Sequence, residues 1–111
     1  MEAKERTVVT YEAKNGHAAF DEWLDSFGSN EVAGIIIARV ERVEAGLFGD
    51  CESVGEGVTE LKIDFRSGYR VYFGQLGDIV ILLNGGDKDT QEKDIKEAKR
   101  LWSEFKSREV Q

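Results

Sequence analysis

Three short segments at hairpin spacing constrain the fold of this chain more than any other feature. Residues 59–65, 69–75 and 79–83 are rich in β-branched and aromatic side chains, and the turn signals Ser67-Gly68 and Gly77-Asp78 separate them. Such segments with glycine turns between them predict consecutive antiparallel strands. The last segment is apolar at successive positions, which indicates a central strand covered on both faces.

Alternation along the first two segments separates an apolar side from a polar side. The residues expected to face the core are Leu61, Ile63, Phe65, Tyr69, Val71 and Phe73. The residues expected to face away are Glu60, Lys62, Asp64, Arg66, Arg70 and Tyr72. The pattern therefore predicts a sheet that carries cations on its outer side, with Arg70 beside Lys62.

Helical periodicity surrounds these strands. An apolar stripe at i, i+3, i+4 and i+7 from Phe20 to Phe27 predicts a helix that ends at Gly28. Ser29-Asn30 is a capping signal for a second helix, which Gly46 ends. A last helix is expected after Asp89 or Thr90, with Asp89 and Glu92 at capping-box spacing. Its stripe is Ile95, Ala98, Leu101 or Trp102, and Phe105.

A strand over residues 6–12 and a glycine-rich loop over residues 47–58 complete the prediction. The order is strand, helix, helix, three strands, helix. Such segregation predicts a small α+β fold in which an antiparallel sheet packs against helices. A length of 111 residues suits one domain spanning residues 1–111.

Charge is distributed unevenly along the chain. The net charge is −7, yet residues 1–58 hold 12 acidic and 5 basic side chains, whereas residues 59–88 hold 4 of each. Phosphate neutralisation needs cations, so the total disfavours nucleic acid as a ligand. The neutral stretch can still carry a local cationic patch.

The sequence indicates a cytoplasmic protein. The lone Cys51 can form no internal disulfide, and the N-terminus lacks a signal-peptide pattern. The longest apolar run, residues 79–83, is far too short to span a bilayer, so no membrane association is expected.

Several motifs follow one another in an order and spacing that resemble a known family. They are Trp23-Leu24, Gly46-Leu47-Phe48-Gly49-Asp50, Val54-Gly55-Glu56-Gly57-Val58, Glu60-Leu61-Lys62-Ile63, Gly68-Tyr69-Arg70-Val71-Tyr72-Phe73 and Leu82-Leu83-Asn84-Gly85-Gly86-Asp87-Lys88. This run, over residues 18–105, resembles the addiction module killer proteins, HigB-like members of the RelE/ParE toxin superfamily. The resemblance implies the small RelE/ParE-like fold, of bacterial or phage origin.

The resemblance also implies a function. It indicates the toxin of a type II toxin–antitoxin pair, neutralised by a protein antitoxin that usually carries a helix-turn-helix domain. RelE-like members are mRNA interferases that act commonly at the ribosome, whereas ParE-like members poison DNA gyrase. A shared fold does not choose between these targets. No cofactor and no metal are expected.

By motif position, the resemblance assigns catalytic roles to Arg70, Lys62 and Lys88. Arg66, Tyr72 and Gln91 are the residues expected to bind the substrate. Metal-free RNA cleavage needs a base for the 2′-hydroxyl, cations for the phosphorane and a proton for the leaving oxygen. Lys62 could serve as that base only with a depressed pKa. The family pattern more often has arginine at Lys62 and glycine or another small residue at Arg66.

Three alternatives remain open from the sequence. The cations can simply pair with Glu60, Asp64 or Asp87 across the sheet. The chain can be a non-nucleolytic toxin or binding module that inhibits gyrase or another protein. It can also be a relic that keeps the fold without activity. His17 and Cys51 lie far in sequence from the cationic strands and are not expected to act in catalysis.

Overall fold

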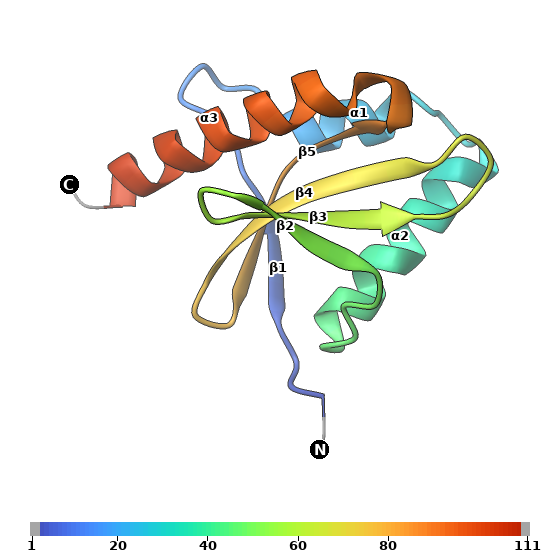
Figure 1. The fold of residues 1–111 in the computed structure, drawn as a ribbon, viewed down its shortest axis with the longest axis horizontal. Coiled ribbons are helices and arrows are strands. Elements are labelled where there is room, and N and C mark those ends of the chain that lie inside the picture. The colour runs from blue at the N-terminus through green and yellow to red at the C-terminus, as the bar shows by residue number, and fades with distance from the viewer. Residues whose placement is uncertain (1–2, 110–111) are drawn as a thin grey trace.

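The computed structural model describes residues 3–109, which form one five-stranded sheet with helices on both sides (Figure 1). The strands are β1 (Thr7–Thr10), β2 (Cys51–Gly55), β3 (Val58–Ile63), β4 (Tyr69–Leu76) and β5 (Ile79–Asp87). The helices are α1 (Ala19–Asp25), α2 (Glu31–Glu44) and α3 (Gln91–Glu109), and a 3₁₀ turn, η1 (Lys88–Thr90), precedes α3. The α+β class is thereby confirmed.

The sheet is mixed, so the prediction of a purely antiparallel sheet is wrong. The strand order is β1-β5-β4-β3-β2, and β1 runs parallel to β5 while every other pair is antiparallel. The predicted hairpins among β3, β4 and β5 are confirmed. Side-chain alternation carries no information on the direction of a partner strand, and β1 meets β5 only after a long excursion of the chain through α1 and α2.

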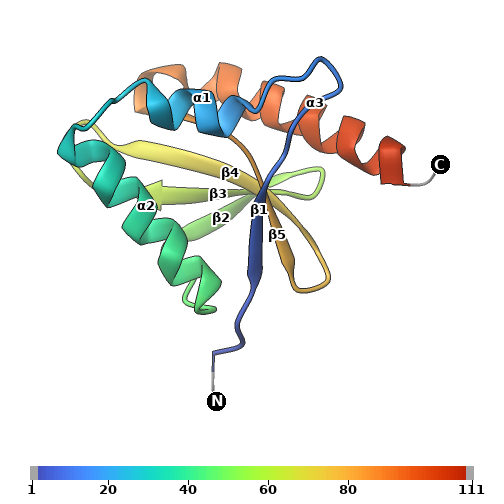
Figure 2. The same cartoon turned by 180° about the vertical axis from the view of Figure 1, so that it is seen from behind.

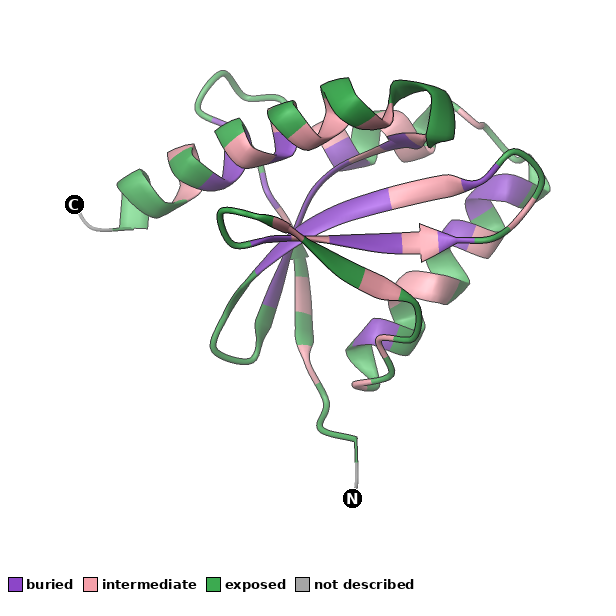
Figure 3. Ribbon diagram, in the orientation of Figure 1, coloured by how far each residue is buried: buried purple, intermediate pink, exposed green. Residues whose placement is uncertain are grey.

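Helices cover the two faces of the sheet unequally. Helices α1 and α2 lie on one face and α3 crosses the other, as the two opposite views show (Figures 1 and 2). The face below α1 and α2 buries Leu61, Val71 and Phe73, and the face below α3 buries Tyr72, Ile81 and Leu83. Buried residues therefore follow one another along the middle of β4 and most of β5 (Figure 3). Among residues 3–109, no helix is long and apolar enough to cross a membrane.

The predicted loop over residues 47–58 contains β2, which is a correction to the sequence analysis. This strand pairs with β3 around a tight turn at Glu56 and Gly57, both of which have positive φ. Glycines at such turns predict a loop. In addition, only two of the five β2 side chains are partly buried, so the sequence shows no alternation that would indicate a strand.

Two further boundaries differ from the predictions. Strand β5 continues to Asp87 through Asn84, Gly85 and Gly86, beyond the predicted end at Leu83. The cap before the last helix is Asp87, whose side chain accepts hydrogen bonds from the N–H groups of Asp89 and Thr90, in place of a cap at residue 89 or 90. By contrast, Asn30 caps α2 as predicted, by accepting from the Val32 N–H.

Both tryptophans pack on strand glycines. A Cβ atom at Gly85 would overlap the indole of Trp23 from α1, and one at Gly74 would overlap Trp102 from α3. A missing side chain lets a helix approach a sheet closely. Glycine inside these strands thus sets the distance between the sheet and the helix on each side.

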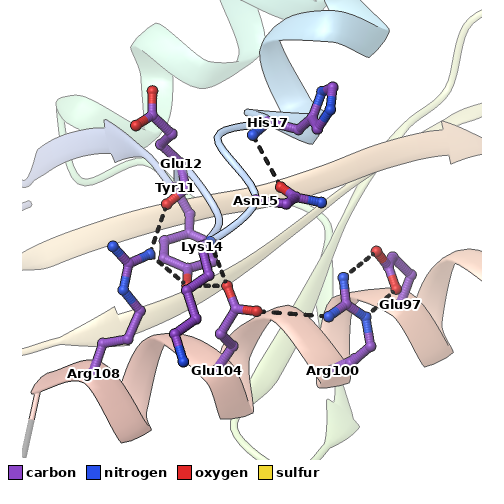
Figure 4. Close-up of polar contacts among 9 residues, drawn as sticks. All are labelled: Tyr11, Glu12, Lys14, Asn15, His17, Glu97, Arg100, Glu104 and Arg108. Carbon is purple, nitrogen blue, oxygen red and sulfur yellow. Dashed lines mark hydrogen bonds and ion pairs between the residues drawn. The ribbon is translucent and has the colours of Figure 1, made fainter.

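A polar cluster fastens the segment after β1 to α3 (Figure 4). The Tyr11 hydroxyl donates to Glu104 at 2.5 Å, and the Lys14 N–H donates to the same carboxylate oxygen at 2.9 Å. Arg108 donates to the Tyr11 hydroxyl at 3.1 Å and to the Glu12 carbonyl at 3.0 Å. The hydrogen bond from Tyr11 is the largest cause that lowers the pKa of Glu104 below its ordinary value of 4.5.

We expect Gly85→Ala to destabilise the fold by about 1–3 kcal/mol, because the added methyl group forces Trp23 out of its place. The measurement is urea-induced unfolding. Gly34→Ala in α2 is the matched control, since a Cβ there meets nothing within 4 Å. The control should gain about 0.5–1 kcal/mol from helix propensity. Equal effects of the two substitutions would contradict the packing argument.

We expect Glu104→Gln to lower stability at neutral pH and to flatten the loss of stability in acid. A carboxyl group whose pKa is depressed in the folded protein stabilises it above the unfolded value of 4.5, and this contribution disappears as pH falls through the folded pKa. Urea unfolding from about pH 7 down to about pH 3 tests this. Glu109→Gln, at the exposed end of the same helix, should leave the pH profile unchanged.

Candidate functional site

A cleft of about 270 Å³ opens where β3 and β4 meet their connecting loop and η1. Its lining residues, here called the cationic cleft, are Asp50, Lys62, Asp64, Arg66, Ser67, Gly68, Arg70 and Lys88. Four cationic side chains thus line the cleft, and the first and last of them, Lys62 and Lys88, are 26 positions apart in the sequence. They are all the basic residues found between residues 59 and 88.

Strand register explains why these cations meet. Lys62 on β3 lies directly opposite Arg70 on β4, as predicted, and Arg70 lies opposite Gly86 on β5. Lys88 follows two residues later, where β5 ends and the capped η1 turns the chain back. Arg66 comes from the β3–β4 loop with φ of 54°, a left-handed conformation that favours glycine. This agrees with the small residue that the family pattern has there.

Carboxylates neutralise part of the cleft. Lys62 donates to Glu52 at 2.8 Å, Arg66 pairs with Glu31, and Arg70 Nε lies 3.7 Å from Glu60. Of the three carboxylates expected to pair with these cations, Glu60 alone does so within residues 3–109. Within residues 3–109, Lys88 forms no ion pair. Lys88 is thus the cation with the least neutralised charge.

The protein fixes the Arg70 side chain but does not pair all of its N–H donors. Its side chain is 16% exposed, and Nη1 donates to the Tyr69 carbonyl at 3.2 Å. The buried Nε finds no hydrogen-bond partner among the described residues. A guanidinium carries five N–H donors, and those on Nη2 take part in no hydrogen bond within residues 3–109, so they are the ones left for a ligand. A planar group of this kind suits the oxygens of a phosphate.

Beside the cleft lies a buried polar network, which we call the Glu60 network and which consists of Glu60, Tyr72, Gln91 and Arg70. The Glu60 carboxylate is 2% exposed. It accepts from the Tyr72 hydroxyl at 3.0 Å and from Gln91 Nε2 at 2.7 Å. Gln91 is the first residue of α3, so this carboxylate ties β3 and β4 to that helix.

Two residues that were predicted to face outward, Glu60 and Tyr72, are buried in this network. Glu60 and Tyr72 lie on the face that alternation predicted, but α3 covers that face, and both side chains are almost completely buried. Burial and the bond to Glu60 raise the pKa of Tyr72 above its ordinary value. Tyr72 therefore does not reach the cleft to stack on a base or to transfer a proton, and Gln91 is engaged with Glu60.

Lys62 does not have the pKa that base catalysis requires. Its hydrogen bond to Glu52 raises the pKa above the ordinary value, whereas a general base near neutral pH needs a lowered one. Lys62 is accordingly a source of positive charge in this arrangement. Neither Glu52 nor the lining residue Asp50 was predicted to lie at the site, because the loop prediction concealed β2.

The remaining candidates lie outside the cleft. His17 bonds to Glu22 at 2.7 Å near the start of α1, and Cys51 is a free, partly buried thiol on β2. Within residues 3–109, no group of three or more metal-ligating side chains comes together.

We expect Tyr72→Phe to cost about 1–2 kcal/mol of stability, because Glu60 then loses a hydrogen-bond donor in a buried site. If the cleft binds a short single-stranded RNA, that binding should not change. Tyr69→Phe is the matched control, since no hydrogen bond of its hydroxyl is found in residues 3–109. Urea unfolding and fluorescence anisotropy give the two readouts. Loss of RNA binding by a stably folded Tyr72→Phe variant would contradict the purely structural role.

Comparison with known proteins identifies one relative of this chain. No family model matches the sequence, and no solved structure matches it. An uncharacterized protein from Haemophilus influenzae is 51% identical over 87 residues, which are 78% of this chain and 88% of that protein. The resemblance to the RelE/ParE toxins thus stays a prediction from motifs. Identity at this level over most of both chains means that the chain belongs to the same family as the Haemophilus influenzae protein.

Proposed function

We propose that this chain is the HigB-like toxin of a type II toxin–antitoxin pair, an mRNA interferase of RelE type that cleaves RNA without a metal ion. A cognate antitoxin, with a helix-turn-helix domain, holds it inactive in the bacterial cytoplasm, and its substrate is mRNA, including mRNA on the ribosome. The observation that carries the proposal is the convergence of Lys62, Arg66, Arg70 and Lys88 on one cleft.

The cleft has the charge and size for one phosphodiester. Four cations and two carboxylates line it, so it is locally positive on a protein whose net charge is −7. The acidic remainder would repel a long polyanion and would confine RNA contact to this site. Such a footprint suits an enzyme that acts on a strand presented by a larger assembly.

In the proposed reaction, the 2′-oxygen attacks the neighbouring phosphorus and the bond to the 5′-oxygen breaks. The 2′-hydroxyl gives its proton to a carboxylate of the cleft, and the leaving 5′-oxygen takes a proton from that carboxyl group or from water, so that a 2′,3′-cyclic phosphate and a free 5′-hydroxyl result. Arg70 and Lys88 would stabilise the charge of the phosphorane, and Arg66 would bind a flanking phosphate. The bond to Glu52 raises the pKa of Lys62, so Lys62 stays protonated and adds to the positive potential of the cleft.

The proton acceptor is then a carboxylate. Lys62 has a raised pKa, Tyr72 is buried under α3, and His17 lies on another element. Asp50 and Asp64 are the carboxylates among the lining residues, and both are exposed. Either can reach a substrate that enters the cleft, and substituting each by asparagine separates their contributions.

One observation favours a second candidate function. No lining residue of the cleft is a histidine, and the pKa of Lys62 there is raised. A toxin that binds DNA gyrase or another protein and performs no chemistry needs neither. In that case the same cations would contact acidic side chains of the target.

We expect induced expression of the native chain to arrest growth and to generate new mRNA 5′ ends, detected by primer extension. Arg70→Ala and Lys88→Ala should reduce cleavage by about a hundredfold or more, because each removes a charge that stabilises the phosphorane. Lys96→Ala, an exposed lysine of α3 outside the cleft, is the matched control and should stay toxic.

The outcomes separate the candidates. Growth arrest without new mRNA ends would contradict the mRNA interferase function and favour a toxin that binds a protein target. Growth that continues while the native chain accumulates in folded form would refute both. Circular dichroism of each purified variant tests whether the protein is still folded, since Arg70→Ala removes a member of the Glu60 network.

A further inference from the structure

Strand β1 is an edge strand whose outer side is open from Val8 to Thr10; just before it, the Arg6 N–H donates to the Glu44 carbonyl at the end of α2, at 2.8 Å. Its backbone bonds to β5 through alternate residues: the Thr7 N–H donates to the Asp78 carbonyl at 3.0 Å, and the Tyr11 N–H donates to the Leu82 carbonyl at 2.9 Å. By the same alternation, the N–H and C=O groups of Val8 and Thr10 point away from the sheet. Within residues 3–109, no other strand pairs with this side.

The two edges of the sheet differ in how they are protected. At the opposite edge, β2 contains a register shift between Ser53 and Gly55 and carries the charged Glu52. Bulges and charges of this kind keep other chains from pairing. Strand β1 shows no register shift, and its sequence is Thr-Val-Val-Thr, which has high strand propensity. The β1 edge is therefore the one able to accept another strand.

A groove of about 330 Å³ adjoins this open edge. Its apolar lining comes from β1, α1, α2 and β5 through Val8, Phe20, Ile37, Val40 and Leu82. Two of the large apolar side chains exposed on the described surface flank the edge: Ile37 is 45% exposed beside the groove, and Val9 is 44% exposed on the other face of β1. A sixth strand would cover both side chains at once.

The charge of the groove decides what kind of strand fits. Glu41 and Glu44 on α2 are its charged lining residues, and neither forms an ion pair within residues 3–109. Pairing of two copies through β1 would bring four such carboxylates together on molecules that each carry a net charge of −7. Repulsion disfavours a second copy, whereas basic side chains would complement the groove.

We propose that the open edge of β1 and its groove bind an extended segment of a partner protein, with alternating apolar and basic residues, as a sixth strand of the sheet. The backbone groups of Val8 and Thr10 provide the hydrogen bonds. Apolar side chains of the partner fill the groove beside Ile37, and its basic side chains meet Glu41 and Glu44. This inference is independent of RNA cleavage, because the cationic cleft shares no lining residue with the groove.

The test uses the whole chain and a dye-labelled peptide of alternating valine and lysine. Hydrogen exchange followed by NMR reports each amide of β1. In the free protein the amides of Val8 and Thr10 should exchange quickly, and saturating peptide should slow both by about tenfold or more. The Thr7 and Tyr11 amides already bond to β5 and serve as internal references.

Two controls separate strand pairing from simple attraction between opposite charges. The same peptide with alternate amides N-methylated keeps its charge but loses its backbone donors, so it should bind at least about tenfold more weakly. The double variant Glu41→Lys, Glu44→Lys should also weaken binding. Glu109→Lys, at the end of α3 on the opposite face of the sheet, is the control for added positive charge and should affect binding less.

Each outcome bears on the proposal. Slow exchange at Val8 and Thr10 with the plain peptide, lost with the methylated peptide, supports it. Unchanged exchange at saturating peptide, or equal binding of both peptides, overturns it. Slow exchange at these amides without peptide, together with a dimer in analytical ultracentrifugation, would overturn it in favour of a second copy.

Discussion

The buried carboxylate of Glu60 is the group on which the rest of the arrangement depends. It belongs to β3, receives one donor from β4 and one from the first turn of α3, and lies beside the guanidinium of Arg70. A carboxylate in the interior is costly unless such partners surround it. Because each partner comes from a different part of the fold, satisfying this single group fixes the strands, the helix and the cation relative to one another.

Coverage of both sheet faces determines where this protein can meet other molecules. The indoles of Trp23 and Trp102 lie against glycines on opposite faces, and the helices that carry them exclude solvent from the middle of the sheet. A ligand can then reach only the ends of strands and the outer edges. The cationic cleft lies at a strand end, and the acidic groove lies along an edge. Two surfaces of opposite charge thus occupy separate parts of the perimeter.

The sequence determined the local elements well and their long-range relations poorly. Alternation placed Leu61, Lys62 and Arg70 on their correct sides, and helical periodicity found Ala98 and Leu101 as core residues of α3. The sequence pattern could not show that α3 would cover Tyr72, because the alternation of a strand does not indicate which helix packs on that strand. It also missed β2, whose side chains are too exposed to give a period. The parallel pairing of β1 depends on contacts between distant segments, which no local signal encodes.

The parallel pair of β1 and β5 has a consequence for how the chain is made. Residues 7–10 are synthesised well before residues 79–82, with which they pair. Strands β2 to β5 follow one another with short turns and can pair as they appear, whereas the first strand has no neighbour until Leu82 exists. During synthesis the sheet can therefore form in chain order from β2 to β5, and β1, the strand that is made first, joins it last.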